Sequence, residues 1–346
     1  MVEFHMSQLA KKHQYTHWTV EEMLSIPAEE ISSPGQLCAD PRVSVILMTR
    51  NHAPYLRQAL ESVLCQVTSF SFEVLLGEDH STDHSITLCH DLQTAYPKTV
   101  RVITAAKQVG ITANFLRLQV RARAPFVALL EGDDYWTSAN KLERQIELLD
   151  NNPDWAWCGA RTLNRIHPLP ASESYGLSEV SRRFVVHTST IMYRRKALNI
   201  YPRFPDMVGW ISMVSIVLSQ AGRCGFLDET VSYYRRHAGG LYTGANTLHR
   251  IELAQAFTDV MRSHLANRYD KELFDRELWI CSWELQLDPQ TFSLQLWIYR
   301  IKILFSLIAP RLCLRMPGHF LKLVSNVISQ PLRVVYFWKR NKKSSV

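Results

Sequence analysis

Three carboxylates crowd one short stretch of the sequence, Glu131-Gly132-Asp133-Asp134, directly after an apolar run. Like charges this close repel one another, so the arrangement needs a cation or several hydrogen-bond donors to be stable. Carboxylate oxygens suit Mg²⁺ or Mn²⁺, and a metal held by one or two of them can share its other positions with a diphosphate. The alternative interpretation is that Asp134 only caps the start of the next helix.

A second acidic cluster joins Glu78-Asp79 to Ser81-Thr82-Asp83. A carboxylate that follows a sheet strand can accept hydrogen bonds from a base N–H or from ribose hydroxyls. Taken alone, the cluster is more typical of a turn followed by a helix N-cap. We expect a binding role for Asp79 because a parallel sheet would place it beside the first cluster.

A third cluster is cationic, Tyr234-Arg235-Arg236-His237. Arginine forks and imidazole rings are good partners for phosphate oxygens. The alternative is the end of a strand with solvated cations.

The elements that must position these clusters follow from the hydrophobic pattern. Apolar, β-branched runs predict buried strands, and helical spacing with N-cap residues predicts a helix between each pair. Strands that alternate with helices indicate a parallel sheet covered on both faces. Ligands bind such sheets at the carboxyl ends of the strands, which is where the acidic clusters and Thr49-Arg50-Asn51 fall. The predicted strands are residues 43–48, 72–76, 100–104 and 125–130.

The charge of the chain is unevenly distributed. Of 346 residues, 39 are Lys or Arg and 32 are Asp or Glu, but residues 289–346 hold ten of the cations and no acid. The rest of the chain therefore carries a net charge of −3. A basic tail with many aromatic and apolar residues favours contact with an anionic membrane surface over nucleic-acid binding. The alternative is that the tail helices pack on the body of the protein and only the basic end is solvated. Arg300 and Lys302 interrupt the apolar run 294–309, so we expect a helix that lies at the membrane interface or packs on the protein, and no membrane span.

Cysteine usage indicates a reducing compartment. The seven cysteines form no C-x-x-C pair, which suggests neither a disulfide framework nor a thiolate zinc site. The first residues lack the cationic-then-apolar layout of a secretory signal. We expect a cytoplasmic protein, peripheral on the inner face of the plasma membrane.

Four segments together resemble the family 2 inverting glycosyltransferases, which have a GT-A fold. They are VSVILMTRNHAPYLRQALESVLCQ, FEVLLGEDHSTDHS, EGDDYWTSANKLERQIELLDNNP and GFLDETVSYYRRHAGG, in family order over residues 42–240. The resemblance implies an α/β fold: a Rossmann-like, mostly parallel sheet flanked by helices, with a helical C-terminal extension. The expected organisation is an arm at 1–40, the transferase domain at 41–240 and the basic extension at 241–346.

The resemblance also implies roles for the clustered residues. The nucleotide pocket would be lined by Thr49, Arg50 and Asn51, and Asp79, with Glu78 beside it, would meet the base.

The diphosphate end of the donor would be bound by the other two clusters. Asp133 would touch ribose or metal, Asp134 would ligate Mn²⁺ or Mg²⁺, and His237 would reach the diphosphate or its metal, with Arg236 beside it. The expected metal set is Asp134, Asp133 and His237.

Three positions depart from the family pattern or are ambiguous within it. Glu131 stands where many relatives carry Asp. Relatives often carry Gly-Asp-Trp, a candidate general base, where this chain has Val208-Gly209-Trp210, so Asp206 is the nearest replacement. The segment that begins at His187 resembles a family strand on the acceptor side, and we interpret His187 as a buried, hydrogen-bonded histidine.

The sequence thus predicts transfer of a single sugar, with inversion, from a nucleoside-diphosphate sugar to a saccharide or lipid-linked saccharide. Uridine diphosphate is the expected nucleotide, and bacterial surface polysaccharide the expected product. A catalytically impaired relative that binds a nucleotide sugar or a partner protein is the main alternative. A dehydrogenase is disfavoured because no G-x-G-x-x-G follows the first strand. A processive synthase is disfavoured because no Gln-x-x-Arg-Trp motif is present.

Overall fold

The structure, a computed structural model, describes residues 20–164, 172–183, 186–198, 210–240, 247–266, 268–284 and 324–325. The chain divides into two compact units, Met1–His237 and Ala238–Val346. The second unit contains helices α9 (Thr247–His264) and α10 (Asp270–Glu284).

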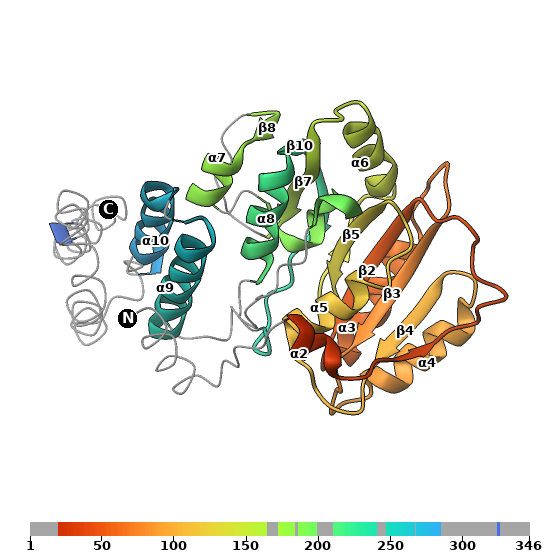
Figure 1. The fold of residues 1–346 in the computed structure, drawn as a ribbon. Coiled ribbons are helices and arrows are strands. Elements are labelled where there is room, and N and C mark those ends of the chain that lie inside the picture. The colour runs from red at the N-terminus through yellow and green to blue at the C-terminus, as the bar shows by residue number, and fades with distance from the viewer. Residues whose placement is uncertain are drawn as a thin grey trace, which may run out of the picture. The chain divides into compact units, whose positions relative to one another are not determined.

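Four parallel strands form the part of the sheet that ends at the acidic clusters (Figure 1). They are β2 (Val43–Thr49), β3 (Phe72–Glu78), β4 (Val100–Thr104) and β5 (Phe126–Glu131), in the spatial order β4-β3-β2-β5. Every residue of β2 is buried, because helices cover both faces of a parallel sheet. The predicted α/β fold with its four strands is confirmed.

Helices alternate with these strands along the chain. Helices α3 (Ala53–Leu64) and α4 (Ser85–Ala95) pack on the face that presents Val74 and Leu76. Helix α5 (Ile111–Gln119) packs on the other face, where Leu118 lies against Gly77. Alternation of side chains along β3 explains why one strand supports both layers.

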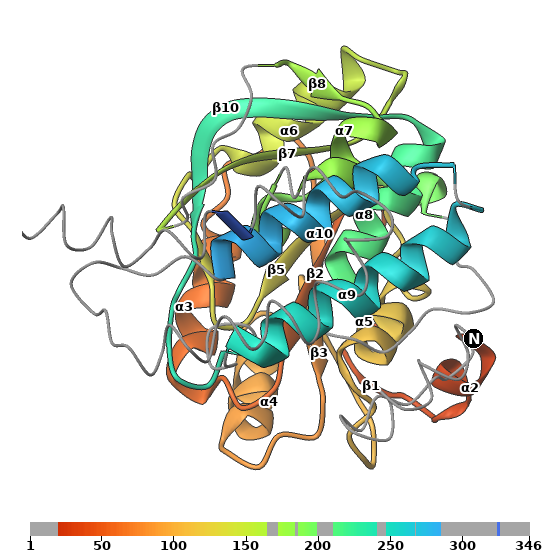
Figure 2. The same ribbon diagram turned by 90° about the vertical axis from the view of Figure 1, so that its left-hand side faces the viewer.

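The remaining half of the sheet is mixed and was not predicted from the sequence. Strand β9 (Met192–Arg194) lies antiparallel between β5 and β7 (Trp155–Leu163), and β7 pairs in parallel with β10 (Arg223–Tyr233). Figure 2 shows β10 curving along the sheet. Three irregularities in its register with β7 account for that bend, since a bulge kinks the strand that carries it.

Shorter elements complete the first unit. Strand β1 lies antiparallel to β4, β6 and β8 lie antiparallel to β10, and helix α6 follows the acidic turn. The segment after His187, expected to be a strand, forms a 3₁₀ turn instead, because the carbonyls of His187 and Thr188 accept short-range bonds within it. The bounds are α2 (Val20–Ser25), β1 (Glu29–Ile31), β6 (Tyr135–Trp136), α6 (Lys141–Asp150), β8 (Ser174–Tyr175), α7 (Leu177–Arg182), η1 (Thr188–Thr190), η2 (Arg195–Ala197) and α8 (Trp210–Ala221).

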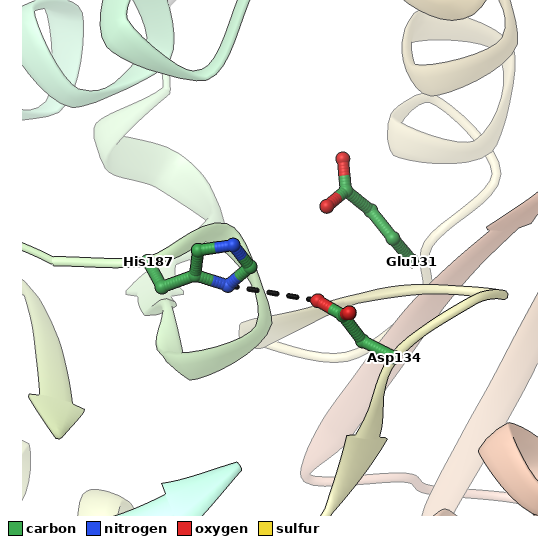
Figure 3. Close-up of side chains that lie close together, drawn as sticks. All are labelled: Glu131, Asp134 and His187. Atoms are coloured by element: carbon green, nitrogen blue, oxygen red, sulfur yellow. Dashed lines mark ion pairs between the residues drawn. The ribbon is translucent and has the colours of Figure 1, made fainter. Parts of the chain in front are cut away.

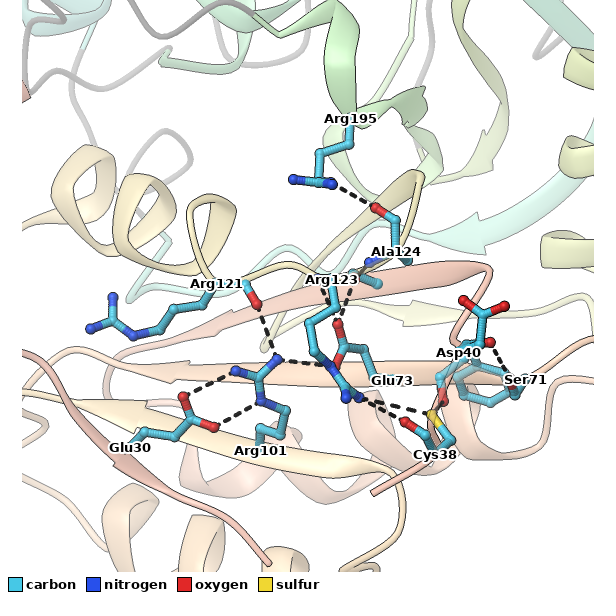
Figure 4. Close-up of polar contacts among 12 residues, drawn as sticks. Glu30, Cys38, Asp40, Ser71, Glu73, Arg101, Arg121, Arg123, Ala124 and Arg195 are labelled. Carbon is cyan, nitrogen blue, oxygen red and sulfur yellow. Dashed lines mark hydrogen bonds and ion pairs between the residues drawn. The ribbon is translucent and has the colours of Figure 1, made fainter. Parts of the chain in front are cut away.

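A buried ion network closes the amino-terminal end of the parallel strands, opposite the acidic clusters (Figure 4). The Glu73 carboxylate accepts hydrogen bonds from Ser44 Oγ at 2.7 Å, Arg123 Nε at 2.7 Å and Arg101 Nη1 at 3.0 Å. Burial alone would raise the pKa of Glu73, but hydrogen bonds from Arg123 and Ser44 and the charge of Arg101 hold that pKa below its ordinary value. Arg101 also binds Glu30 with two nitrogens, which ties β1 to the sheet.

No helix within the described ranges is long and apolar enough to cross a membrane. Residues 294–309 and nearly all of the basic tail lie outside those ranges, so the expected membrane contact stays a prediction.

Candidate functional site

The predicted polar residues meet at one edge of the sheet because their strands end level with one another. Thr49 pairs with Glu78 across β2 and β3, and Met48 pairs with Glu131 across β2 and β5. The turn after β5 and the loops after β2 and β3 therefore share the carboxyl edge, where parallel sheets bind ligands.

The turn after β5 places two acids beside a histidine from a distant segment (Figure 3). Glu131, Asp134 and His187 each offer a ligand atom, and these atoms lie within 4.8 Å of one another. We refer to these three residues as the acid–histidine cluster. Asp134 is 1% exposed, and its Oδ1 accepts a hydrogen bond from the Arg235 backbone N–H at 2.9 Å.

In the part of the chain that the structure describes, the second carboxylate oxygen of Asp134 is buried without a hydrogen-bond donor. Asp134 Oδ2 has no hydrogen-bond partner among the described residues, and His187 Nδ1 lies 3.6 Å away. Burial, together with the neighbouring charges of Glu131 and Asp133, raises the pKa of Asp134 to about 9. A buried carboxylate with an orphaned oxygen is costly, and a divalent cation is one group that would compensate it.

His187 reaches the cluster from the η1 turn. Its Nδ1 lies 2.7 Å from Ser189 Oγ, and its carbonyl accepts from Thr190 Oγ1 at 2.8 Å. The histidine is therefore buried and hydrogen-bonded, as the sequence indicated. Its approach to Asp134 was not anticipated, because the two residues are 53 positions apart and no local pattern connects them.

A second, more open group forms around Asp133, the residue that precedes Asp134 in the same turn. Asp133 Oδ2 is 3.0 Å from His237 Nε2 and 3.8 Å from His52 Nε2. The side chains of Asp133 and His237 are 17% and 15% exposed, so this pair is more accessible than Asp134. The structure thus divides the predicted metal set between two groups: Asp134 in the acid–histidine cluster, and Asp133 with His237 in the open pair.

The two arginines of the cationic cluster lie differently. The Arg235 guanidinium is held between the rings of Tyr55 and Tyr135, at 4.6 and 5.3 Å from their centroids, and its Nε donates to the Asp133 carbonyl at 2.7 Å. Arg235 therefore braces the acidic turn. Arg236, the predicted donor ligand, is exposed beside His237.

The loop after β2 is fixed to the loop after β3. Asn51 has a φ of 56°, and its Oδ1 accepts a hydrogen bond from the Thr82 N–H at 2.8 Å. Arg50 is exposed, whereas the buried Thr49 Oγ1 has no hydrogen-bond partner among the described residues. These three residues lie at the carboxyl edge of the sheet, where the sequence predicts the nucleotide pocket.

The two acids at the end of β3 are engaged within the fold. Asp79 accepts from the backbone N–H groups of Val109 at 2.7 Å and Gly110 at 3.1 Å. Glu78 accepts from His80 and Ser81 backbone N–H groups and from Thr104 Oγ1. These bonds show a loop-holding function, and contact with a base stays a prediction. The predicted base, Asp206, lies outside the described residues.

A Rossmann-like sheet with polar side chains at its carboxyl edge places the chain among the α/β proteins that bind ligands at that edge. The chain belongs to glycosyl transferase family 2, whose family model matches residues 44–218. The fold and family predicted from the sequence are thereby confirmed.

Individual known proteins extend the comparison. The chain is 30% identical over 219 residues to the uncharacterized protein Rv1520 of Mycobacterium tuberculosis, a match that covers 59% of this chain and 62% of that protein. It is 27% identical over 172 residues to the minor teichoic acid biosynthesis protein GgaA of Bacillus subtilis, covering 46% and 35% of the two chains. The chain thus spans less than two thirds of the length of these relatives.

A solved structure shares the fold. The mannosyltransferase PcManGT from Pyrobaculum calidifontis, in complex with GDP-Man and Mn²⁺, has a TM-score of 0.54 and 15% identity over 92% of each chain.

Proposed function

We propose that this protein transfers a single sugar from a nucleoside-diphosphate sugar to an acceptor hydroxyl, with inversion and with the help of a divalent cation. The observation that carries the proposal is the orphaned Oδ2 of Asp134, which is buried at the carboxyl edge of the sheet beside Glu131 and His187. An oxygen and imidazole donor set of this kind fits Mn²⁺ or Mg²⁺. Family membership supports sugar transfer as the chemistry.

The two groups around the acidic turn suit different parts of this task. The acid–histidine cluster is buried and would hold the cation, which when bound stabilises negative charge on the leaving diphosphate. The more accessible Asp133 and His237, with the exposed Arg236, would orient the diphosphate and ribose of the donor. Arg235 fixes the acid–histidine cluster and the Asp133–His237 pair relative to each other, because it donates hydrogen bonds to both Asp134 and Asp133.

The acceptor hydroxyl must lose a proton as its oxygen attacks the anomeric carbon. A carboxylate is the expected base, and Asp206 is the candidate offered by the sequence. The proposed acceptor is a saccharide or lipid-linked saccharide in surface-polymer synthesis. The similarity to GgaA, a minor teichoic acid biosynthesis protein, supports this choice. A UDP-sugar is the first donor to test, and the GDP-Man complex of PcManGT makes a GDP-sugar the second.

The experiment is donor hydrolysis with and without Mn²⁺ over a panel of nucleotide sugars. Asp134→Ala should lose activity by about 100-fold or more, because charge stabilisation at the leaving group is lost. Asp91→Ala is the matched control, since Asp91 is exposed on α4. Equal rates for Asp134→Ala and the wild-type protein would refute the metal role. Tight donor binding without turnover in the wild-type protein would favour a non-catalytic relative.

Contact between the basic tail and an anionic membrane belongs to the same proposal. Sedimentation with anionic liposomes should depend on residues 310–346, and equal binding after their deletion would exclude the tail as the anchor.

A further inference from the structure

Lys141 carries a buried amino group without an anionic partner among the described residues. It begins α6, its residue is 0% exposed, and it forms no ion pair with any described residue. Its Nζ donates to Gln145 Oε1 at 2.6 Å and lies 4.1 Å from the centroid of the Trp136 ring. Burial lowers the pKa of Lys141 to about 7, which shows how unfavourable the position is for an ammonium group.

Two residues that Lys141 contacts, Trp136 and Gln145, hold the η1 turn. Trp136 Nε1 donates to the Ser189 carbonyl at 2.8 Å, and Gln145 Nε2 donates to the Thr190 carbonyl at 2.7 Å. The bond from Lys141 fixes which end of the Gln145 amide is the acceptor, so the donor end must face Thr190. The Lys141 amino group packs over the face of the Trp136 ring, and its protonated form adds a cation–π attraction that holds the indole in place.

The η1 turn in turn sets the position of His187. Ser189 Oγ lies 2.7 Å from His187 Nδ1 and donates to Ser232 Oγ at 3.0 Å, so the turn, the histidine and β10 are linked. A shift of the turn would carry His187 away from Asp134.

We propose that Lys141 is a positioning residue for the acid–histidine cluster, acting through Trp136 and Gln145 on the turn that carries His187. The inference rests on the proposed function in one respect, the metal-binding role of the acid–histidine cluster. Groups that orient the ligands of a metal without touching the metal commonly change its affinity or the activity by about 10- to 100-fold when they are replaced.

Substitution by methionine separates positioning from support of the fold. Met has a similar length and no donor. The substitution removes a buried amino group that has no anionic partner among the described residues, and this gain offsets the cost of leaving Gln145 Oε1 without its donor. Lys141→Met should therefore lower kcat for Mn²⁺-dependent donor hydrolysis by about 10- to 100-fold while the urea midpoint stays equal or rises. Lys98→Met is the control, because Lys98 is exposed in the turn before β4 at the opposite end of the sheet.

A double-mutant cycle tests whether Lys141 acts through His187. In a His187→Ala background, Lys141→Met should cause no further loss of kcat. Independent losses that multiply, or a fall in kcat that follows a fall in stability, would overturn the proposal.

Crystal structures of Lys141→Met and Gln145→Leu decide the matter without any activity. Both should show the η1 turn displaced and the approach of His187 Nδ1 to Asp134 Oδ2 lost. An unchanged turn in both variants would overturn the proposal. Failure of the wild-type protein to turn over any donor would count against the proposed function alone, and these structures would still test the role of Lys141.

Discussion

Replacing Asp134 with Asn should make the metal-free protein more stable, and increasingly so as the pH rises. Burial and the charges of Glu131 and Asp133 raise the pKa of Asp134 from 3.8 to about 9. Between these two values the native protein retains a proton that the unfolded chain has released. Stability therefore falls with rising pH, by about 1.4 kcal/mol per pH unit for one group. Asn carries no titrating proton, so Asp134→Asn lacks this slope.

The difference between the two proteins can be worked out for a convenient range. From pH 6 to pH 8 the unfolded Asp134 carboxyl is fully ionised and the folded one is mostly protonated. The free energy of unfolding of the wild-type protein should fall by about 3 kcal/mol relative to that of Asp134→Asn over this range. Saturating Mn²⁺ should cancel the effect, because a ligand of the native state adds stability by mass action.

The assay is urea unfolding at pH 6, 7 and 8 in the presence of a chelator, with Asp91→Asn as the exposed control. Other groups titrate alike in the two proteins and cancel in the comparison. Parallel stability profiles, with the difference between the proteins changing by less than about 0.5 kcal/mol from pH 6 to 8, would refute the reasoning.

Two further variants test the frame around the site. Glu73→Gln should destabilise the protein by about 3–5 kcal/mol in urea unfolding, because it removes the buried negative charge that pairs with both Arg101 and Arg123. Since the pKa of Glu73 lies below its ordinary 4.5, the advantage of the wild-type protein should shrink as the pH falls below that value; an advantage that grows in acid would contradict the assignment. Gly132→Ala should destabilise by about 1–3 kcal/mol, because its Cβ would lie 3.0 Å from Met48 O and from His52 Nδ1. A variant with wild-type stability and wild-type KM for the donor would show that the acidic turn has more room than these contacts allow.

The parallel half of the sheet could be predicted from the sequence because its strands are buried on both faces. Such strands are continuous apolar runs, and the polar residues that end them stand out. Residues 43–48 and 125–130 were therefore recognised, and both clusters of acids fell at the predicted edge. The other half was not accessible. Strand β9 has three residues, and its antiparallel place between β5 and β7 depends on pairings across at least 34 positions.

The site itself was only partly predictable for the same physical reason. The acids at 131–134 are adjacent in sequence, so their crowding was evident. The division of Asp133 from Asp134 between an open pair and a buried cluster depends on which way each side chain leaves the turn. The loop-holding bonds of Asp79 to Val109 and Gly110 depend on a loop 30 residues away. His187 had one signal, an imidazole in an apolar segment, and that signal fits a buried structural histidine equally well.

The most direct measurement is anomalous diffraction from crystals grown with Mn²⁺ and the nucleoside diphosphate that raises thermal stability most. A manganese peak at the turn after β5, within about 2.2 Å of Asp134 Oδ2 and in contact with the diphosphate, is the expected result. A nucleotide bound without any metal at this turn, or a manganese ion whose ligands exclude Asp134, would contradict the central claim.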